Sequence, residues 1–199
     1  MRSVIEAGTT VWPRYMRAVL LCAGLIFAQG ASAQDAELLA LLSSGDHFGF
    51  MRHSTAPGSD DPPNFRIGDC ATQRNLSSGG RQQAVEIGER LRANGISDAR
   101  VVSSQWCRCV DTSELLGFGE IEELPSLNSL YSYPGQGRVM TGALAEWLAE
   151  QDLTTPTILV THQVNISSLV RNGAGEGDIL IVKRSPDGGF EVIDRLRPD

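Results

Sequence analysis

The sequence has few basic residues, and almost none of them is lysine. Lysine and arginine together number 17 against 24 acidic residues, which gives a formal net charge of −7. Lys183 is the one lysine, so arginine supplies nearly all of the positive charge. Because a protein that binds nucleic acid needs a basic surface, we expect no nucleic-acid partner. Arginine binds phosphate and carboxylate groups with a planar fork of donors that lysine lacks.

The sequence also lacks a hydrophobic run long enough to cross a membrane. Its longest apolar run, residues 18–29, has about a dozen positions, whereas a membrane-spanning helix needs ~20. Hydrophobic residues make up 41% and charged residues 21% of the 199 residues, which is a globular composition and excludes disorder, collagen and coiled coil. At this length we expect one domain with a sizeable core.

The first 33 residues have the pattern of a secretory signal peptide. Two arginines precede the apolar run, and Ala31-Ser32-Ala33 follows it as a cleavage site. The alternative is a buried N-terminal helix. We expect cleavage after Ala33, with translation starting at either Met1 or Met16. The mature chain, residues 34–199, is then expected to be periplasmic or secreted, without stable membrane insertion after cleavage.

Cysteine is scarce, and pairs with metal-binding spacing are absent. The expected mature chain contains Cys70, Cys107 and Cys109, without a CxxC pair, and its three histidines are scattered. Zinc is therefore a weak alternative, and we expect no metal and no cofactor. An oxidising compartment favours a disulfide, whereas helical positions two apart do not face each other. The open possibilities are Cys70 with Cys107, Cys70 with Cys109, and all thiols free; the working hypothesis is Cys70 with Cys107.

Strand and helix patterns alternate along the mature chain. This order predicts an α/β fold, a three-layer sandwich with a mostly parallel central sheet closed by a hairpin. Residues 54–76 and 120–135 are expected to be irregular, and a loop as long as the first is usually functional. The expected strands are 47–52, 100–103, 157–161, 178–183 and 190–195, and the expected helices are 35–43, 78–94, 105–116, 138–151 and 164–170.

Cationic and imidazole side chains follow three of the expected strands. Arg52 and His53 come at the end of the first, Arg108 lies shortly after the second, and His162 follows the third. Because ligands bind at the carboxyl ends of parallel strands, we expect these residues to meet in one crevice. Two guanidinium groups can bracket a phosphoryl group while an imidazole attacks phosphorus. This predicts a small phosphorylated substrate. His47 has no motif around it and is predicted to be structural.

The same segments resemble the histidine phosphatase superfamily, which has the phosphoglycerate-mutase-like fold. Arg52-His53 is similar to the family's RHG signature, although a serine follows where glycine is usual. Residues 75–84 are similar to its L-[ST]-x-x-G-x-x-Q-A segment, and residues 104–112 to its S-x-L-x-R-A-x-x-T segment. Residues 159–162 are similar to the strand that delivers the family's second histidine. These segments come in family order over about 47–170.

The resemblance implies a metal-independent phosphatase that acts on a phosphate monoester or a phosphohistidine. His53 would be the nucleophile that becomes phosphorylated, and water would complete the cycle. Arg52, Arg108 and His162 would form the phosphate pocket. Residues 34–199 would be the histidine phosphatase domain. Oligomeric state is not predicted.

The sequence departs from the family pattern where a proton donor is expected. Ser129 stands where one branch has glutamate, and Gln163 follows the second histidine where the other branch has aspartate. A general acid contributes about 10²–10⁴-fold, so its loss would slow substrates with poor leaving groups. The alternative function is therefore a catalytically degenerate protein that binds a phosphorylated ligand. The candidate replacement acids are Glu122 and Glu123, together with Asp60, Asp61 and Asp69 in nearby loops.

Overall fold

The computed structural model describes residues 33–198, and the elements below belong to the unit Asp35–Asp199. The expected signal peptide falls almost wholly on residues 1–32, which lie outside the described residues. In the part of the chain that is described, no helix combines the length and apolarity needed to cross a membrane.

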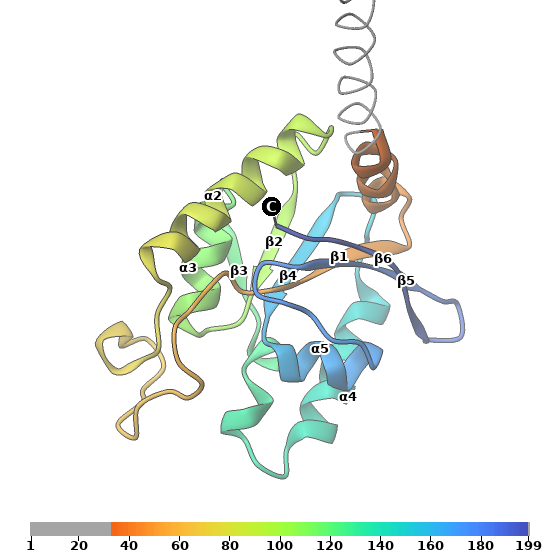
Figure 1. Cartoon of the computed structure of the whole chain (residues 1–199). Coiled ribbons are helices and arrows are strands. Elements are labelled where there is room, and N and C mark those ends of the chain that lie inside the picture. The colour runs from red at the N-terminus through yellow and green to blue at the C-terminus, as the bar shows by residue number, and fades with distance from the viewer. Residues whose placement is uncertain (1–32, 199) are drawn as a thin grey trace, which may run out of the picture. The chain divides into compact units, whose positions relative to one another are not determined.

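The described strands form one six-stranded sheet in the order β3-β2-β4-β1-β5-β6 (Figure 1). The four strands from β3 to β1 are parallel, while β5 and β6 add an antiparallel hairpin at the other edge. The predicted mostly parallel sheet with a closing hairpin is thus confirmed. The strands are β1 (His47–Arg52), β2 (Arg100–Ser103), β3 (Ile121–Glu123), β4 (Thr157–Thr161), β5 (Ile179–Arg184) and β6 (Phe190–Leu196).

Helices cover both faces of this sheet, and their bounds lie within about two residues of the predicted ones. Residues 35–40 are also helical and run into a short 3₁₀ turn, η1 (Leu41–Ser43). The other helices are α2 (Ser78–Ala93), α3 (Cys107–Leu115), α4 (Gly137–Glu150) and α5 (Gln163–Val170), and the long loop contains the 3₁₀ turn η2 (Cys70–Thr72).

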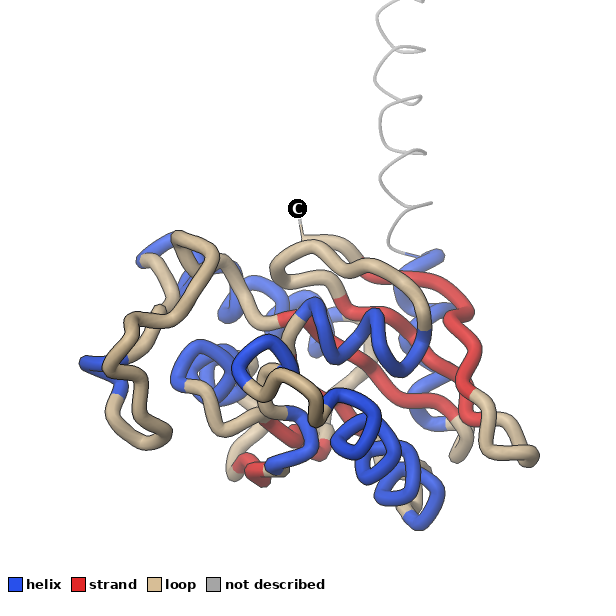
Figure 2. The backbone as a smooth tube through the Cα atoms, turned by 90° about the horizontal axis from the view of Figure 1, so that it is seen from below, coloured by secondary structure: helices blue, strands red, loops and turns tan. Residues whose placement is uncertain are grey.

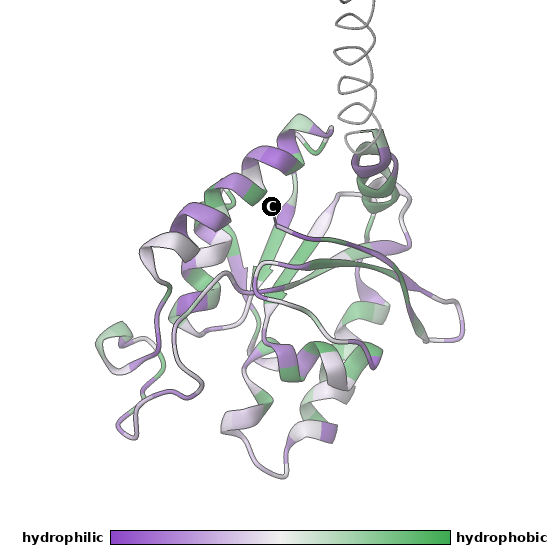
Figure 3. Cartoon of the chain, in the orientation of Figure 1, coloured by the Kyte–Doolittle hydropathy of each residue, from purple (hydrophilic) through white to green (hydrophobic). Residues whose placement is uncertain are grey.

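Two apolar clusters, one on each face of the sheet, make up the core. Successive side chains of a strand point to opposite faces, so a continuous apolar strand fills both layers. In β4, Ile158 and Val160 pack with residues of α2 and α3, whereas Leu159 packs with residues of α4 and α5. The apolar colouring of the strands in Figure 3 follows from this burial on both sides. The predicted three-layer sandwich is therefore correct.

The prediction that 120–135 is irregular is wrong in part. Ile121–Glu123 forms β3, which pairs with β2, and Pro125–Leu127 and Leu130–Ser132 form the 3₁₀ turns η3 and η4. Strand β3 has one apolar residue beside two exposed glutamates, so it is too short to show an alternating pattern. Its strand conformation comes from main-chain pairing at the sheet edge, which local sequence does not encode.

Helix α2 packs closely against the loop that follows β1. Its N-cap is Ser77, whose Oγ accepts a hydrogen bond of 2.9 Å from the backbone N of Gly80. A Cβ at Gly80 would lie 2.0 Å from the carbonyl oxygen of Thr55, and one at Gly88 would lie 2.1 Å from that of Leu116. Glycine at these two positions lets α2 approach both segments, which places the start of the long loop beside the sheet.

The carboxyl ends of β1, β2 and β4 lie level with one another. Arg52 pairs with Thr161 in the sheet register, and the backbone N of His53 donates to the Thr161 carbonyl oxygen at 3.0 Å. On the other side of β4, the backbone N of Ser104 donates to the Val160 carbonyl oxygen at 2.9 Å. The segments that follow these strands therefore start from one edge of the sheet, as predicted. The 54–76 loop projects at one side of the unit in both backbone views (Figure 2).

Candidate active site

A cavity of about 140 Å³ lies at this edge of the sheet. One water takes up roughly 30 Å³ of the liquid, so the cavity has room for a tetrahedral oxyanion. Its wall includes all the residues expected to contact phosphate, although they come from separate parts of the sequence. The lining residues are Arg52, His53, Ser59, Asp60, Asp61, Arg74, Arg108, Ser129, Tyr131, His162, Gln163 and Val164.

His53 is held with one ring nitrogen free. Its Nδ1 lies 2.8 Å from the carbonyl oxygen of Ser54. Because a carbonyl oxygen only accepts, Nδ1 carries the proton and Nε2 carries a lone pair. The residue is 1% exposed, and burial, together with the charges of nearby arginines, lowers its pKa to about 3. His53 is therefore a neutral imidazole in the neutral pH range, as a nucleophile must be.

His162 lies beside His53 at the same cavity, with 5.6 Å between the ring centroids. Its Nε2 is 2.9 Å from Ser104 Oγ, and its Nδ1 is 3.3 Å from Arg108 Nη2. Burial and the positive charge of Arg108 lower the pKa of His162 well below its ordinary value. The two imidazoles and Arg108 thus form one contiguous group, which is the convergence that the sequence predicts.

Three guanidinium groups line the cavity, and one of them, that of Arg108, is buried. Among the described residues, the Nε atoms of Arg52, Arg74 and Arg108 are buried without a hydrogen-bond partner. Glu176 holds Arg52 in place by accepting from its Nη2 at 3.2 Å. Three guanidinium groups around one cavity favour an anionic ligand.

Arg74 is the cavity-lining cation that the sequence analysis missed. It comes from the end of the 54–76 loop, and its Nη1 donates to the carbonyl oxygens of Ala56 and Gly58. Burial and the nearby charge of Arg108 lower its pKa. In the sequence, Arg74 directly precedes segment 75–84, which resembles the family's L-[ST]-x-x-G-x-x-Q-A motif. The motif itself does not include Arg74, so it does not identify this residue.

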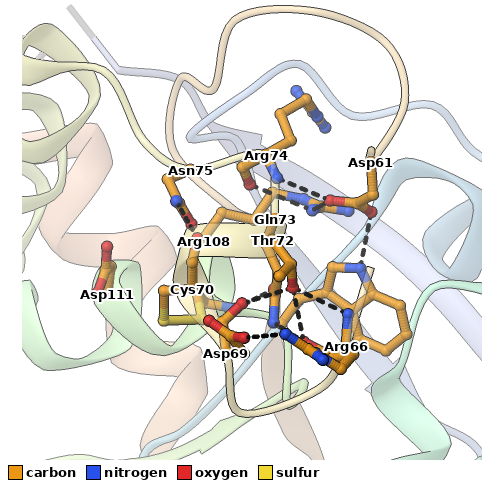
Figure 4. Close-up of a disulfide and its surroundings, with 12 residues drawn as sticks. Asp61, Arg66, Asp69, Cys70, Thr72, Gln73, Arg74, Asn75, Arg108 and Asp111 are labelled. Carbon is orange, nitrogen blue, oxygen red and sulfur yellow. Dashed lines mark hydrogen bonds and ion pairs between the residues drawn. A yellow bond between two sulfur atoms is a disulfide. The ribbon is translucent and has the colours of Figure 1, made fainter. Parts of the chain in front are cut away.

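Asp61 orders the arginines around the cavity. Its carboxylate accepts from the backbone N of Arg74 at 2.9 Å, from Arg108 Nη1 at 2.8 Å and from Trp106 Nε1 at 2.9 Å. Figure 4 shows Asp61 beside the backbone of Arg74 and the guanidinium group of Arg108. Burial alone raises the pKa of Asp61, but these hydrogen bonds and the charge of Arg108 outweigh it and lower the pKa. Asp61 is therefore an ionised anchor for Arg108, which excludes it as a proton donor near neutral pH.

The acids expected to replace the missing proton donor do not gather at the cavity. Glu122 and Glu123 are exposed on β3 and do not line it, because the edge strand ends before the chain reaches the site. Glu122 is instead ion-paired with Arg100 at 2.6 Å. Of the candidate acids, only Asp60 and Asp61 are lining residues. Within the described residues, no three His, Cys, Asp or Glu side chains are grouped so as to hold a metal ion.

A disulfide joins the long loop to the start of α3. It links Cys70 to Cys107, one of the two pairings left open by the sequence, and Cys107 directly precedes Arg108. Cys109 is a buried free thiol, and burial raises its pKa to about 12. The disulfide therefore fixes the segment that carries Asp61 and Arg74 against the helix that carries Arg108.

The buried neutral histidines predict that mild acid destabilises the fold. The pKa of His53 is lower in the folded chain than in the unfolded chain, so unfolding takes up a proton. The stability due to His53 is fully present above about pH 6.5 and is lost as the pH falls towards about 3. His162 acts in the same direction. From pH 6 to pH 5, we expect the free energy of unfolding to fall by roughly 1 kcal/mol through His53, and to fall further through His162.

Urea unfolding at these two pH values measures this change, with His53→Asn as the comparison. The variant should show a smaller fall, because the contribution of His53 is gone and that of His162 remains. An identical pH dependence in both proteins would show that His53 is not buried as a neutral group.

No protein-family model matches the sequence, and no curated protein matches it. Solved structures do match. A protein histidine phosphatase, SixA, complexed with tungstate has a TM-score of 0.55 and 18% identity, over 76% of this chain and 97% of that one. A mycobacterial glucosyl-3-phosphoglycerate phosphatase complexed with VO₃ has a TM-score of 0.54 and 17% identity, over 75% and 98%.

A phosphoserine phosphatase from Entamoeba histolytica, in complex with 3-phosphoglyceric acid, has a TM-score of 0.56 and 13% identity. The match covers 77% of this chain and 98% of that one. These identities are low, but each match spans nearly the whole of the other chain. The chain therefore has the fold of the histidine phosphatase superfamily, the phosphoglycerate-mutase-like fold that its motifs predict.

Proposed function

We propose that this chain is a phosphatase that hydrolyses a phosphate monoester or a phosphohistidine through a covalent phosphohistidine on His53. The observation that carries the proposal is the pairing of one neutral imidazole with three guanidinium groups at one cavity. The Nδ1 proton of His53 is held by Ser54, so Nε2 has the lone pair that attack on phosphorus requires.

The ligands of similar proteins support this assignment. SixA was solved with tungstate, and the mycobacterial glucosyl-3-phosphoglycerate phosphatase was solved with VO₃. Both are oxyanions with a central atom surrounded by oxygens, as in a phosphoryl group. In this chain the guanidinium groups of Arg52, Arg74 and Arg108 would bind the equatorial oxygens, whose charge persists in the transition state.

The proposed reaction has two steps. First, Nε2 of His53 forms a bond to phosphorus while the bond from phosphorus to the leaving oxygen or nitrogen breaks. Second, water attacks the phosphohistidine, and the electron pair of the broken P–N bond returns to Nε2, which releases inorganic phosphate. The three arginines stabilise the phosphoryl charge in both steps because they are fixed before the substrate arrives. The proposal also includes metal independence. It includes export as well, which rests on the signal-like pattern of the first 33 residues.

The second candidate function is a protein that binds a phosphorylated ligand without turning it over. Ser129 at the place of a family glutamate favours it, and Ser129 does line the cavity. Both functions predict that the chain binds an oxyanion. Only the phosphatase predicts that phosphate is released from a substrate.

A panel of phosphorylated compounds tests the proposed function. We expect the purified chain to release phosphate from aryl phosphates and from at least one of sugar phosphates, phosphoserine peptides and phosphohistidine peptides, with EDTA present throughout. Tight binding of tungstate without release of phosphate from any compound would favour the binding protein instead.

A further inference from the structure

Hydrogen bonds fix the proton on one nitrogen of His162. The backbone N of Gln105 donates to Asn128 Oδ1 at 2.9 Å, which identifies that atom as the acceptor oxygen. Ser104 Oγ lies 3.2 Å from the same oxygen and must therefore donate its own proton to it. Ser104 Oγ then accepts from His162 Nε2, at 2.9 Å. Each direction follows from the previous one, so Nε2 carries the proton.

The other nitrogen of His162 faces a guanidinium group and has a lone pair. Nδ1 lies 3.3 Å from Arg108 Nη2, and a guanidinium group can only donate. Both side chains line the cavity, and His162 is 4% exposed. Without a ligand, the lone pair of Nδ1 is therefore satisfied by the same cation that is placed to bind a phosphoryl oxygen.

A bound phosphoryl group changes this arrangement. A phosphoryl oxygen that binds beside Arg108 also faces the Nδ1 lone pair, and the two repel each other. A proton on Nδ1 removes the repulsion and creates a charge-assisted hydrogen bond. We propose that substrate binding brings a proton onto Nδ1 of His162 and that His162 then protonates the leaving oxygen. This inference rests on the proposed function and supplies the proton donor that the sequence pattern lacks.

The groups around His162 explain why the proton arrives with the substrate. Positive charges dominate the unliganded site, so they oppose a charged imidazolium, whereas a phosphoryl dianion reverses the local field. The thiol of Cys109, 3.6 Å from Nε2, stays neutral because burial raises its pKa to about 12. The charged and titratable groups that face His162 are Arg52, His53, Arg74, Arg108, Cys109 and, through its ion pair with Arg108, Asp61.

The proton balance closes over the two proposed steps. In the first, Nε2 of His53 bonds to phosphorus, the bond between phosphorus and the leaving oxygen breaks, and that oxygen takes both the electron pair and the Nδ1 proton of His162. In the second, water attacks phosphorus and gives one proton back to Nδ1 of His162. The products are the free alcohol and hydrogen phosphate. When hydrogen phosphate leaves, His162 releases to solvent the proton that it took up on substrate binding, so both histidines are neutral again.

A leaving-group series tests the acid role. For His162→Asn, the loss of kcat/KM should be larger by about 10²-fold or more for alkyl phosphates than for 4-nitrophenyl phosphate, which needs no acid. Because the comparison is made within one protein, it does not depend on the folded fraction. Asp60→Asn removes the cavity-lining carboxylic acid that does not anchor Arg108, and the dependence of this variant on the leaving group should match that of the wild type. An equal loss for all substrates in His162→Asn, or a steeper series in Asp60→Asn, would overturn the inference.

Tungstate binding tests proton uptake without any turnover, since tungstate remains a dianion near neutral pH. Calorimetry at pH 7.5 in two buffers of different ionisation enthalpy should show uptake of about one proton by the wild type and by His47→Asn, and almost none by His162→Asn. Tungstate binding by the wild type without proton uptake would contradict the inference even if the chain is a phosphatase. Full turnover by His53→Ala would overturn the proposed function instead, so the two failures are distinguishable.

Discussion

His53→Ala is expected to lower phosphatase turnover by roughly 10³-fold or more, because it removes the nitrogen that forms the covalent intermediate, and the Nδ1 lone pair of His162 already accepts from Arg108. Ser129 is a poor substitute nucleophile, since a hydroxyl needs an adjacent base. The measurement is the steady-state release of phosphate from an aryl phosphate. The variant should still bind tungstate, because the three arginines that hold the oxyanion remain.

The matched control for this variant is His47→Ala. His47 is also buried, but it lies at the opposite end of β1, where its Nδ1 contacts Asp46 and Ser44. We expect its kcat/KM to stay near that of the wild type at a temperature where both are folded. Comparable losses in the two variants would show that general destabilisation, and not chemistry at His53, explains the effect.

Arg108→Met is expected to have the second largest effect, on both activity and stability. Loss of its donors should lower kcat/KM on the order of 10²–10³-fold. The side chains of Arg108 and Asp61 are 4% and 11% exposed, so the variant leaves a buried carboxylate without its cation. Breaking a buried ion pair from one side costs about 3–5 kcal/mol of unfolding free energy. Urea unfolding and steady-state kinetics measure the two effects.

The double variant Arg108→Met with Asp61→Asn separates stability from activity. Removing the charge of Asp61 as well should restore most of the stability, because the penalty comes from an unpaired charge and not from the lost contact. Activity should stay low, since the phosphoryl group still lacks the donors of Arg108. Recovery of activity in the double variant would show that Arg108 acts only by neutralising Asp61.

The sequence predicts those site residues that lie at the ends of strands. Arg52, His53 and His162 lie at the ends of apolar strands, and parallel strands bring such ends to one edge. Their convergence with Arg108 therefore follows from the order of the elements. The same rule predicts the two layers of helices, since the apolar run of β4 requires burial on both faces.

The residues supplied by the long loop could not be placed in this way. Asp61 appears in the sequence as one of several loop acids, and only its contacts with Arg108 and Trp106 reveal that it anchors a cation. Arg74 reaches the cavity because a disulfide and the hydrogen bonds of Asp61 fix the loop. These contacts join residues more than ten positions apart in irregular backbone, where no periodicity signals them.

The proton donor also could not be identified from the sequence. Sequence reasoning looks for a carboxylic acid, and it names Glu122 and Glu123, with three aspartates, because they lie in nearby segments. Strand β3 leaves both at the exposed edge, away from the cavity. The hydrogen-bond directions around His162, which depend on Ser104 and Asn128, can be read only in three dimensions.

The most direct test is to trap the intermediate. The wild type is mixed with an aryl phosphate carrying a labelled phosphoryl group, quenched in alkali within the first turnover and digested for peptide mass spectrometry. The label should be found on the His53 peptide, be lost in acid, and be absent from His53→Ala. An acid-stable label on a serine, or phosphate release with no label on the protein, would contradict attack by His53.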